Sequence, residues 1–468
     1  MAVGIASYGA YVPLHRLGPG TTSWTSATER AVASFDEDSI SMAVAAAINC
    51  LDGFARQDVE ALYFASTTPP YKEKMNATTV SVGADLRPDI CTVDFSGSLR
   101  AGTTALKAAV DAVKAGSAKQ VLVVASDLRV PQPGSEFEST FGDGAAALLI
   151  GNSNAVEIKD SYSISHEILD VWRAEGDAFV RSWEDRFTMD EGYFKILPQA
   201  VSQLMKRHNS SPNDFAKAVF YAPDLRRHRE MARTLGFDPK AQVQDPLFST
   251  MGNTGAAFTL MMLIAALEEA KPGKMLLANY ANGADVFLLQ VTEEIEALKD
   301  RRGVQVHLKS KKMLPNYETY ARWRGLINAA PAVRRPAFRN PSPSAMLRET
   351  DKNLRFHGTK CKHCGYPQYP PQRVCTRCHT KDAFEGYRFS DKKAKVFTYT
   401  MDNLGPTPDP PMVVAIIDFE GGGRAYSIMT DRDVNKLEIG MPVEMTFRKF
   451  YTSEGIHNYF WKCMPIRA

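Results

Sequence analysis

Two Cys-x-x-Cys pairs near the C-terminus constrain the fold of this chain more than any other feature. The first pair is Cys361 and Cys364, the second is Cys375 and Cys378, and ten residues separate the pairs. This spacing can place four thiolates tetrahedrally around one zinc ion. Four thiolates leave no open coordination position for water or substrate, so the sequence predicts a zinc ribbon whose metal is structural. The adjacent His363 and His379 are surplus to such a site.

The overall composition is that of an ordinary globular protein. The 468 residues are 44% hydrophobic and 23% charged, enough to build a large core in two or three domains. With 56 basic and 53 acidic side chains, the net charge of +3 gives no global attraction to nucleic acid or to an anionic membrane. Cys50, Cys91 and Cys463 lack disulfide-like spacing, which favours a reducing cytoplasm. We expect no signal peptide and no membrane span.

Strand-like and helix-like segments alternate ahead of the ribbon. In the first 155 residues we expect helices at 39–50 and 101–115 and strands at 61–65 and 120–125. Such alternation predicts a buried, mainly parallel sheet. A similar order follows, with helices at 196–208, 227–235 and 256–270 and strands at 218–221, 274–280 and 286–291. The repeated order indicates an internal duplication.

The last third of the chain has a different character. Residues 328–345 contain four prolines and several arginines and are interpreted as a linker. Short β-rich runs after the ribbon, at 394–400, 412–419, 423–429 and 443–447, predict a small barrel. The expected domains are 1–155 and 156–327 for the two α/β halves, 346–385 for the ribbon and 386–468 for the barrel.

Four motifs occur in a characteristic order along the α/β part. They are SLRAGTTAL (98–106), FGDGAA (141–146), FYAPDLR (220–226) and GNTGAA (252–257). Together they resemble the thiolase superfamily, in the branch of the HMG-CoA synthases and ketoacyl-ACP synthase III. YETYARWRG (317–325) resembles a late helical segment of archaeal HMG-CoA synthases. The C-terminal part resembles the zinc-ribbon and OB-fold module that accompanies thiolase-like acyl-CoA enzymes.

The resemblance implies a fold, a substrate class and an assembly. The expected core is α/β, duplicated and five-layered in the order α-β-α-β-α, followed by a rubredoxin-like ribbon and an OB-fold barrel. A tunnel for coenzyme A would lead to a buried site, and the chain would form a homodimer through its core. A CoA thioester is the expected substrate.

The resemblance does not carry the family's catalytic residues over unchanged. The nucleophilic cysteine falls on Leu99, the acid of the HMG-CoA synthases on Thr67, and the histidine on Tyr221. Asn253 keeps the residue type of the family motif. A one-residue slip in the alignment would place Ser98 at the nucleophile position. Cys91, in the preceding strand, is expected to be a buried and inert thiol.

The residues that remain suit a reaction on a CoA thioester without a covalent acyl-enzyme. The sequence favours retro-aldol cleavage of a 3-hydroxyacyl-CoA, which needs a base and oxyanion donors but no thiolate. Tyr221 would move the proton, although a phenol with a pKa of about 10 needs help from a cation or a hydrogen bond. Asn253 would hold the enolate oxygen. Their structural alternatives are a core tyrosine and a turn-stabilising amide.

Other roles and functions are left open by the sequence. Arg226 and Arg229 are candidates for the CoA phosphates, although a solvated helix face explains them equally well, and Gly252 joins them as a candidate cofactor-binding residue. One alternative function is an HMG-CoA synthase-like or Claisen-type acyltransferase that uses Ser98. Another is a non-catalytic subunit that binds acyl-CoA. Acidic residues in the expected barrel loops argue against nucleic-acid binding.

Overall fold

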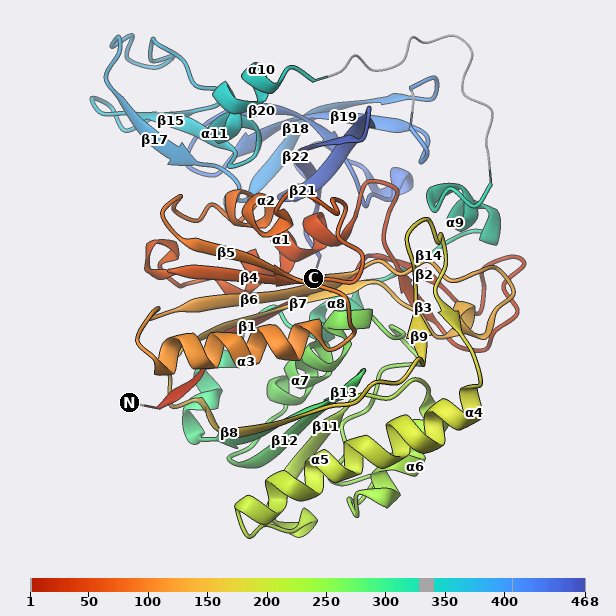
Figure 1. Cartoon of the computed structure of the whole chain (residues 1–468). Coiled ribbons are helices and arrows are strands. Elements are labelled where there is room, and N and C mark those ends of the chain that lie inside the picture. The colour runs from red at the N-terminus through yellow and green to blue at the C-terminus, as the bar shows by residue number, and fades with distance from the viewer. Residues whose placement is uncertain (1, 328–340, 406, 468) are drawn as a thin grey trace. The chain divides into compact units, whose positions relative to one another are not determined.

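The computed structural model describes residues 2–327, 341–405 and 407–467, and the chain divides into two compact units. The first unit comprises Met1–Ala33 and Met42–Tyr317, and the second comprises Ser34–Ser41 and Glu318–Ala468. Most of the expected linker at 328–345 lies outside the described residues, but helix α10 (Pro343–Arg348) begins within it. Figure 1 shows both units.

The first unit is built around a nine-stranded sheet with the order β11-β12-β13-β8-β1-β7-β6-β4-β5. The strands of its N-terminal half are β1 (Val3–Tyr11), β4 (Ala61–Ala65), β5 (Cys91–Phe95), β6 (Val121–Asp127) and β7 (Gly144–Asn152). Those of its C-terminal half are β8 (Val156–Ser165), β11 (Phe215–Phe220), β12 (Gly273–Tyr280) and β13 (Gly283–Val291). Two residue pairs between β1 and β8 join the halves.

The strand pairings confirm the internal duplication. In the first half β4 and β6 are parallel, and β7 is antiparallel to both β6 and β1. In the second half β11 and β12 are parallel, and β13 is antiparallel to both β12 and β8. A parallel bridge between Ala218 and Val243 stands where the first half has the β4–β5 pair.

The expectation of a mainly parallel sheet is wrong. Three of the strand pairings in the nine-stranded sheet are parallel and five are antiparallel. The reason is the type of connection, because β12 and β13 are joined by Ala281 and Asn282 alone, and Asn282 has a φ of +47°. So short a loop forms a hairpin, whereas parallel strands need a long crossover.

Helices separate and cover the two halves of the sheet, which gives the expected α-β-α-β-α layering visible in Figure 1. The main ones are α1 (Ser39–Cys50), α2 (Asn76–Gly83), α3 (Ala101–Lys114), α5 (Phe194–Arg207), α6 (Leu225–Thr234) and α7 (Phe258–Glu268). Helix α7 is buried from Phe258 to Leu267. A helix that is apolar on all sides belongs in a central layer, between two sheet faces. Among the described residues no helix has the length and apolar character of a membrane span.

Short elements complete the first unit. One three-stranded sheet consists of β2 (His15–Leu17), β3 (Arg30–Val32) and β14 (Lys312–Met313), and a hairpin pairs β9 (Val171–Trp172) with β10 (Arg181–Ser182). The short helices α4 (Asp185–Thr188) and α8 (Val304–Lys309) also belong to it, and α9 (Tyr317–Trp323) spans the division between the units.

The second unit contains the zinc ribbon and the barrel. Helices α10 and α11 (Thr350–Asn353) precede the ribbon sheet, which is formed by β15 (His357–Cys361), β16 (Pro367–Gln368) and β17 (Phe384–Arg388). The barrel closes in the order β18-β19-β20-β22-β21. Its strands are β18 (Ala394–Asp402), β19 (Met412–Phe419), β20 (Arg424–Met429), β21 (Pro442–Ser453) and β22 (Ile456–Pro465). Four of these match the expected runs, and β22 was not predicted.

The segment Ser34–Ser41 was expected in the α/β part but belongs to the second unit. Its Asp36 is buried and accepts hydrogen bonds from Lys462 at 2.7 Å and Arg448 at 3.2 Å. Arg448 also pairs with Glu37 at 2.8 Å and with Asp431 at 2.6 Å. A buried ionic network therefore ties this N-terminal segment to the barrel strands.

Candidate functional site

The candidate site lies in the first unit, at the sharp turn between β5 and α3. Gly97 has a φ of +83°, which a glycine adopts without strain, and Ser98 and Leu99 follow it. The carbonyl of Leu99 accepts a hydrogen bond of 3.2 Å from the Asn279 side chain, which fixes the turn. Leu99 is buried and lines a cavity of about 140 Å³.

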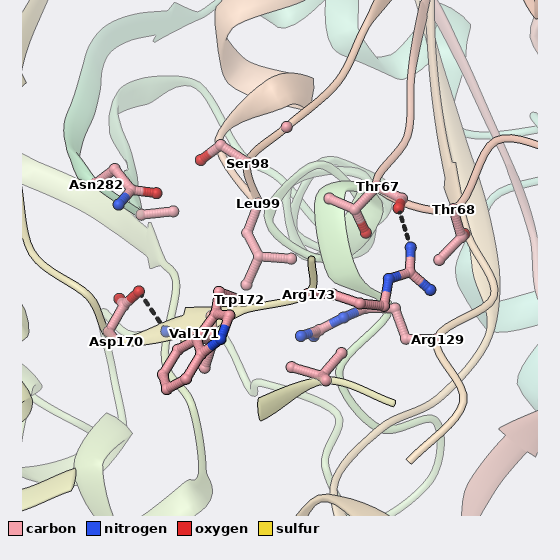
Figure 2. Close-up of a pocket in the computed structure, with 13 residues that line it drawn as sticks. Thr67, Thr68, Ser98, Leu99, Arg129, Asp170, Val171, Trp172, Arg173 and Asn282 are labelled. Carbon is pink, nitrogen blue, oxygen red and sulfur yellow. Dashed lines mark hydrogen bonds between the residues drawn. The ribbon is translucent and has the colours of Figure 1, made fainter. Parts of the chain in front are cut away.

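The cavity is enclosed by the ends of several elements (Figure 2). The residues that line it are Thr67, Thr68, Gly97, Ser98, Leu99, Arg129, Asp170, Val171, Trp172, Arg173, Val180, Ala281 and Asn282. We call this cavity the Leu99 pocket. Its lining contains no cysteine and no histidine. The Ser98 hydroxyl accepts a hydrogen bond of 3.2 Å from the backbone N–H of Arg100, and no base among the lining residues hydrogen-bonds to it.

Cys91 lies away from this pocket, and the expectation that it is buried is wrong. It is the first residue of β5, at the opposite end of that strand from Leu99, and it is exposed. The reason is topological, because β5 is the last strand at one edge of the sheet and its start has one neighbouring strand. Among the described residues, no cysteine thiol therefore lines the pocket.

Thr67, which the sequence predicts to match the family's acid, hydrogen-bonds to a buried carboxylate. Its hydroxyl donates to Asp127 Oδ2 at 2.8 Å, and its backbone N–H donates to Oδ1 at 2.7 Å. Asp127 also accepts from the Ser66 hydroxyl at 2.9 Å and from the backbone N–H of Ala256 at 2.7 Å. The Asp127 carboxylate thus links the end of β4 to the turn that precedes α7.

Tyr221 and Asn253 are close to each other, and neither is part of the pocket lining. Burial raises the pKa of Tyr221 to about 12, while the Arg129 charge and a hydrogen bond from the Asn253 side chain act in the opposite direction. The phenol is therefore protonated near neutral pH and is a proton donor. Asn253 is buried, and its Oδ1 accepts the backbone N–H of Gly255 at 3.0 Å. The turn-stabilising role is thus present in the structure.

Two buried charged residues of the pocket, Arg129 and Asp170, were not predicted from the sequence, and neither was the exposed Arg173. Arg129 follows the end of β6, and Asp170 lies in the loop between β8 and β9; they are 5% and 7% exposed. Burial raises the pKa of Asp170, although a hydrogen bond from the backbone N–H of Val171 and the nearby Tyr280 hydroxyl oppose the rise. The position of Arg129 just after a buried strand was a usable signal, because loops at strand ends carry functional residues. Nothing in the local sequence marked Asp170.

The three candidate cofactor-binding residues lie elsewhere. Arg226 and Arg229 are exposed on α6 and line a separate shallow depression with Leu225, Glu230 and Arg233, which shares no residue with the Leu99 pocket. Gly252 has a φ of +83°, and a Cβ there would lie 2.9 Å from the carbonyl oxygen of Thr140. This glycine is required by the close approach of two backbone segments.

The four ribbon cysteines meet as predicted. Their sulfur atoms all lie within 4.8 Å of one another, with 3.7 Å between Cys361 and Cys378 and 3.6 Å between Cys364 and Cys375. Sulfurs placed tetrahedrally around zinc at about 2.3 Å are about 3.8 Å apart, so the donor set fits the metal. The ligand group found here contains neither His363 nor His379.

Comparison with known proteins agrees with this division of the chain. Residues 93–166 match the model of 3-oxoacyl-[acyl-carrier-protein] synthase III. Residues 352–385 match the rubredoxin-like zinc ribbon domain of ChsH2, and residues 387–448 match its C-terminal OB-fold domain. The ribbon and the OB fold predicted from the sequence are therefore confirmed.

Relatives and solved structures resemble the first unit. The chain is 34% identical over 343 residues to hydroxymethylglutaryl-CoA synthase of Methanopyrus kandleri, which covers 69% of this chain and 97% of that protein. The structure of MvaS in complex with 3-hydroxy-3-methylglutaryl coenzyme A aligns with a TM-score of 0.61 and 19% identity over 72% of this chain and 94% of that chain. PksG, an HMG-CoA synthase from Bacillus subtilis, also gives 0.61, with 20% identity over 70% and 89%. The chain therefore belongs to the hydroxymethylglutaryl-CoA synthase family of the thiolase superfamily, with a zinc ribbon and an OB-fold barrel added after the family's core.

Proposed function

We propose that this protein cleaves a carbon–carbon bond in a 3-hydroxyacyl-CoA by a retro-aldol reaction, without a covalent acyl-enzyme. The observation that carries the proposal is Leu99, which lines the pocket at the turn where the family motif has its nucleophile. A hydrocarbon side chain cannot attack a thioester, and the lining supplies no cysteine or histidine in its place. The MvaS complex contains an acyl-CoA, which supports a CoA thioester as the substrate class.

The reaction needs groups that the pocket contains. A base removes the proton from the 3-hydroxyl, the C2–C3 bond breaks, and an aldehyde or ketone leaves. The bonding electrons pass to the thioester as an enolate, which then takes a proton at C2 to give the shorter acyl-CoA. No oxidant or water is consumed, and the proton taken from the hydroxyl balances the one added to C2.

Asp170 is the proposed base and Tyr221 the proposed proton donor. The carboxyl of Asp170 lines the pocket, and its raised pKa makes it a stronger base than an ordinary aspartate. Tyr221, with a pKa of about 12, cannot serve as the base near neutral pH. Its hydroxyl is instead the proposed proton donor, and the Arg129 charge and the Asn253 side chain both favour loss of its proton. Asn253 is retained as a donor that orients the phenol.

Ser98 supports a second candidate, a condensing acyltransferase. Its hydroxyl lines the pocket one residue from Leu99, so a covalent ester is geometrically available. Its weakness is that no base of the lining hydrogen-bonds to this hydroxyl, and a serine hydroxyl needs such a base to become a nucleophile.

One experiment separates the two candidates. The protein is incubated with a panel of 3-hydroxyacyl-CoA and acyl-CoA thioesters, the released carbonyl compound is trapped with a hydrazine, and the intact protein mass is recorded. A hydrazone together with an unmodified protein supports the retro-aldol reaction. An acyl adduct that disappears in Ser98→Ala overturns it in favour of the acyltransferase. If CoA esters raise the melting temperature but no product forms with any substrate, the protein is a binding subunit.

The route to the pocket, the assembly and the role of the metal complete the proposal. Arg226 and Arg229 bind the CoA phosphates from the surface of α6, because guanidinium groups match phosphate oxygens. Two chains associate through their α/β cores, and the four-cysteine zinc site stabilises the ribbon without taking part in the chemistry.

A further inference from the structure

Arg129 carries a charge that the protein itself leaves without a polar partner. Its side chain is 5% exposed and lines the Leu99 pocket. Within residues 2–327, 341–405 and 407–467 it makes no hydrogen bond of 3.5 Å or less and no ion pair of 4.0 Å or less. The guanidinium carbon instead lies 3.9 Å from the centre of the Phe141 ring. Figure 2 shows the side chain reaching into the pocket from the side of Thr67 and Thr68, opposite Asp170 and Asn282.

The nearby carboxylates do not satisfy this guanidinium. Asp127 is close enough to influence Arg129 electrostatically, but its oxygens already accept hydrogen bonds from Thr67, Thr68 and Ala256. Asp170 also acts on Arg129 through its charge, from beyond ion-pair distance. A guanidinium has five N–H donors, and the protein leaves those of Arg129 to the pocket that this side chain lines. A ligand with an acceptor oxygen would pair with these N–H donors.

The backbone is shaped to admit this side chain. Gly255 has a φ of +64°, and a Cβ at that position would lie 2.9 Å from Arg129 Cδ and 2.2 Å from Asp127 Oδ2. Only glycine leaves room for the arginine and the carboxylate side by side. The turn before α7 therefore provides the space that the Arg129 side chain occupies.

The charge and size of the pocket indicate which ligand it suits. Its lining includes the cations Arg129 and Arg173 and one acid, Asp170, so the cations outnumber the acid. This balance favours an anionic oxygen. A volume of about 140 Å³ suits a short acyl group, since one water-sized group takes about 30 Å³.

We propose that Arg129 is an anion-binding residue of the acyl pocket and holds an anionic oxygen of the bound acyl group. That the pocket holds an acyl group rests on the proposed function. The anionic oxygen has two possible sources, a carboxylate carried at the far end of a short acyl chain or the enolate oxygen formed at the thioester. In both cases an anionic oxygen accepts hydrogen bonds from the N–H groups of the planar guanidinium.

Two measurements that need no bond cleavage test the proposal. The first compares, by calorimetry, the binding of glutaryl-CoA and valeryl-CoA, which have five-carbon acyl chains with and without a terminal carboxylate. The second follows, by mass spectrometry, the exchange of C2 hydrogens of valeryl-CoA in D₂O, which reports enolate formation. Each is made with the wild type, Arg129→Gln, Arg129→Lys and the control Arg186→Gln, which changes an exposed arginine outside the pocket lining.

The two sources predict different results. If the carboxylate is the source, the wild type binds glutaryl-CoA at least tenfold more tightly than valeryl-CoA, and Arg129→Gln removes this preference while valeryl-CoA binding is unchanged. If the enolate is the source, Arg129→Gln slows C2 exchange at least tenfold and leaves both affinities unchanged. Arg129→Lys restores part of either effect, and Arg186→Gln behaves as the wild type in both measurements.

The proposal is overturned if folded Arg129→Gln equals the wild type in both measurements, or if the wild type shows neither the preference nor the exchange. If Arg129→Gln does not fold, as judged by its melting curve, Arg129→Lys and the wild-type preference decide the question. Absence of carbonyl release from every 3-hydroxyacyl-CoA would remove the retro-aldol function without affecting the binding comparison, so the two failures are distinguishable.

Discussion

The hydroxyl of Thr67 donates a hydrogen bond of 2.8 Å to the buried carboxylate of Asp127. The sequence predicts that Thr67 matches the acid of the family motif, and in the structure it is a donor at the end of β4. In the proposed function, Leu99 and Thr67 replace the nucleophile and the acid. The chemistry is proposed to rest instead on Asp170 and Arg129, two residues of other loops that line the pocket.

Replacing Tyr221 by phenylalanine tests its role as proton donor. Tyr221→Phe removes one hydroxyl from a buried position, so we expect CoA-ester binding to persist and turnover to fall about 10²- to 10⁴-fold, the usual contribution of a proton-transfer group. Steady-state kinetics and calorimetry measure the two effects. The matched control is Tyr162→Phe, because Tyr162 is a half-buried tyrosine of β8 that lies outside the pocket lining. A near-normal rate in Tyr221→Phe would remove this residue from the mechanism.

The pH dependence of turnover tests Asp170 as the base. A base acts in its ionised form, and burial raises the pKa of this carboxyl. We therefore expect the rate to fall as the pH is lowered through a value above the ordinary aspartate range of about 4. Asp170→Asn should lose most activity at every pH, and Asp170→Glu should retain an acidic limb at a shifted position. An unchanged profile in Asp170→Asn would contradict the assignment. Asp177→Asn, at a carboxyl outside the pocket lining, is the control.

The ionic network of the second unit should dominate the stability of that unit. Arg448 is 1% exposed and contacts three carboxylates, so Arg448→Met leaves Asp36, Glu37 and Asp431 without their shared cation. Breaking a buried pair in this way costs about 3–5 kcal/mol. Denaturant unfolding measures the loss. Arg424→Met, which breaks the surface pair with Asp418, should cost no more than about 1 kcal/mol. Equal effects of the two variants would contradict the network's importance.

The same network predicts how stability depends on pH. Burial opposes ionisation of Asp36, but Lys462 and Arg448 outweigh it and hold the pKa of this carboxyl well below its usual range. A depressed pKa in the folded state means that Asp36 stabilises the fold above the unfolded pKa of about 4, and that this contribution is lost as the pH falls below it. Unfolding free energies at several pH values should show a steeper acid loss in the wild type than in Asp36→Asn.

Removing zinc should unfold the ribbon. The four cysteine sulfurs would otherwise face one another without the metal that binds them, and structural zinc sites contribute folding free energy directly. We expect about one zinc per chain by elemental analysis, and loss of the metal together with a lower melting temperature in Cys375→Ser. The control Cys91→Ser changes an exposed thiol outside the ribbon and should leave both quantities unchanged. Full zinc content in Cys375→Ser would contradict the assigned ligand set.

Local patterns predicted much of the fold. The expected helix at 39–50 and the strand at 61–65 coincide with α1 and β4, and most other elements differ by a few residues at their ends. Hydrophobic periodicity identifies such elements because it depends on residues close in the sequence. Strand direction was mispredicted, since pairing partners are chosen by packing and by loop length, and β22 was missed in a stretch rich in polar and aromatic residues.

The sequence by itself determined three things about this protein: the ribbon ligands, the order of the duplicated elements, and the absence of a thiol at Leu99. Each depends on residue identity or on spacing along the chain. Only the tertiary structure decided that Arg129 and Asp170 line one pocket with Leu99, and that Asp36 meets Lys462, 426 positions away in the sequence. Contacts of this kind depend on how strands and loops pack, and neither charge nor spacing along the chain records which distant residues that packing brings together.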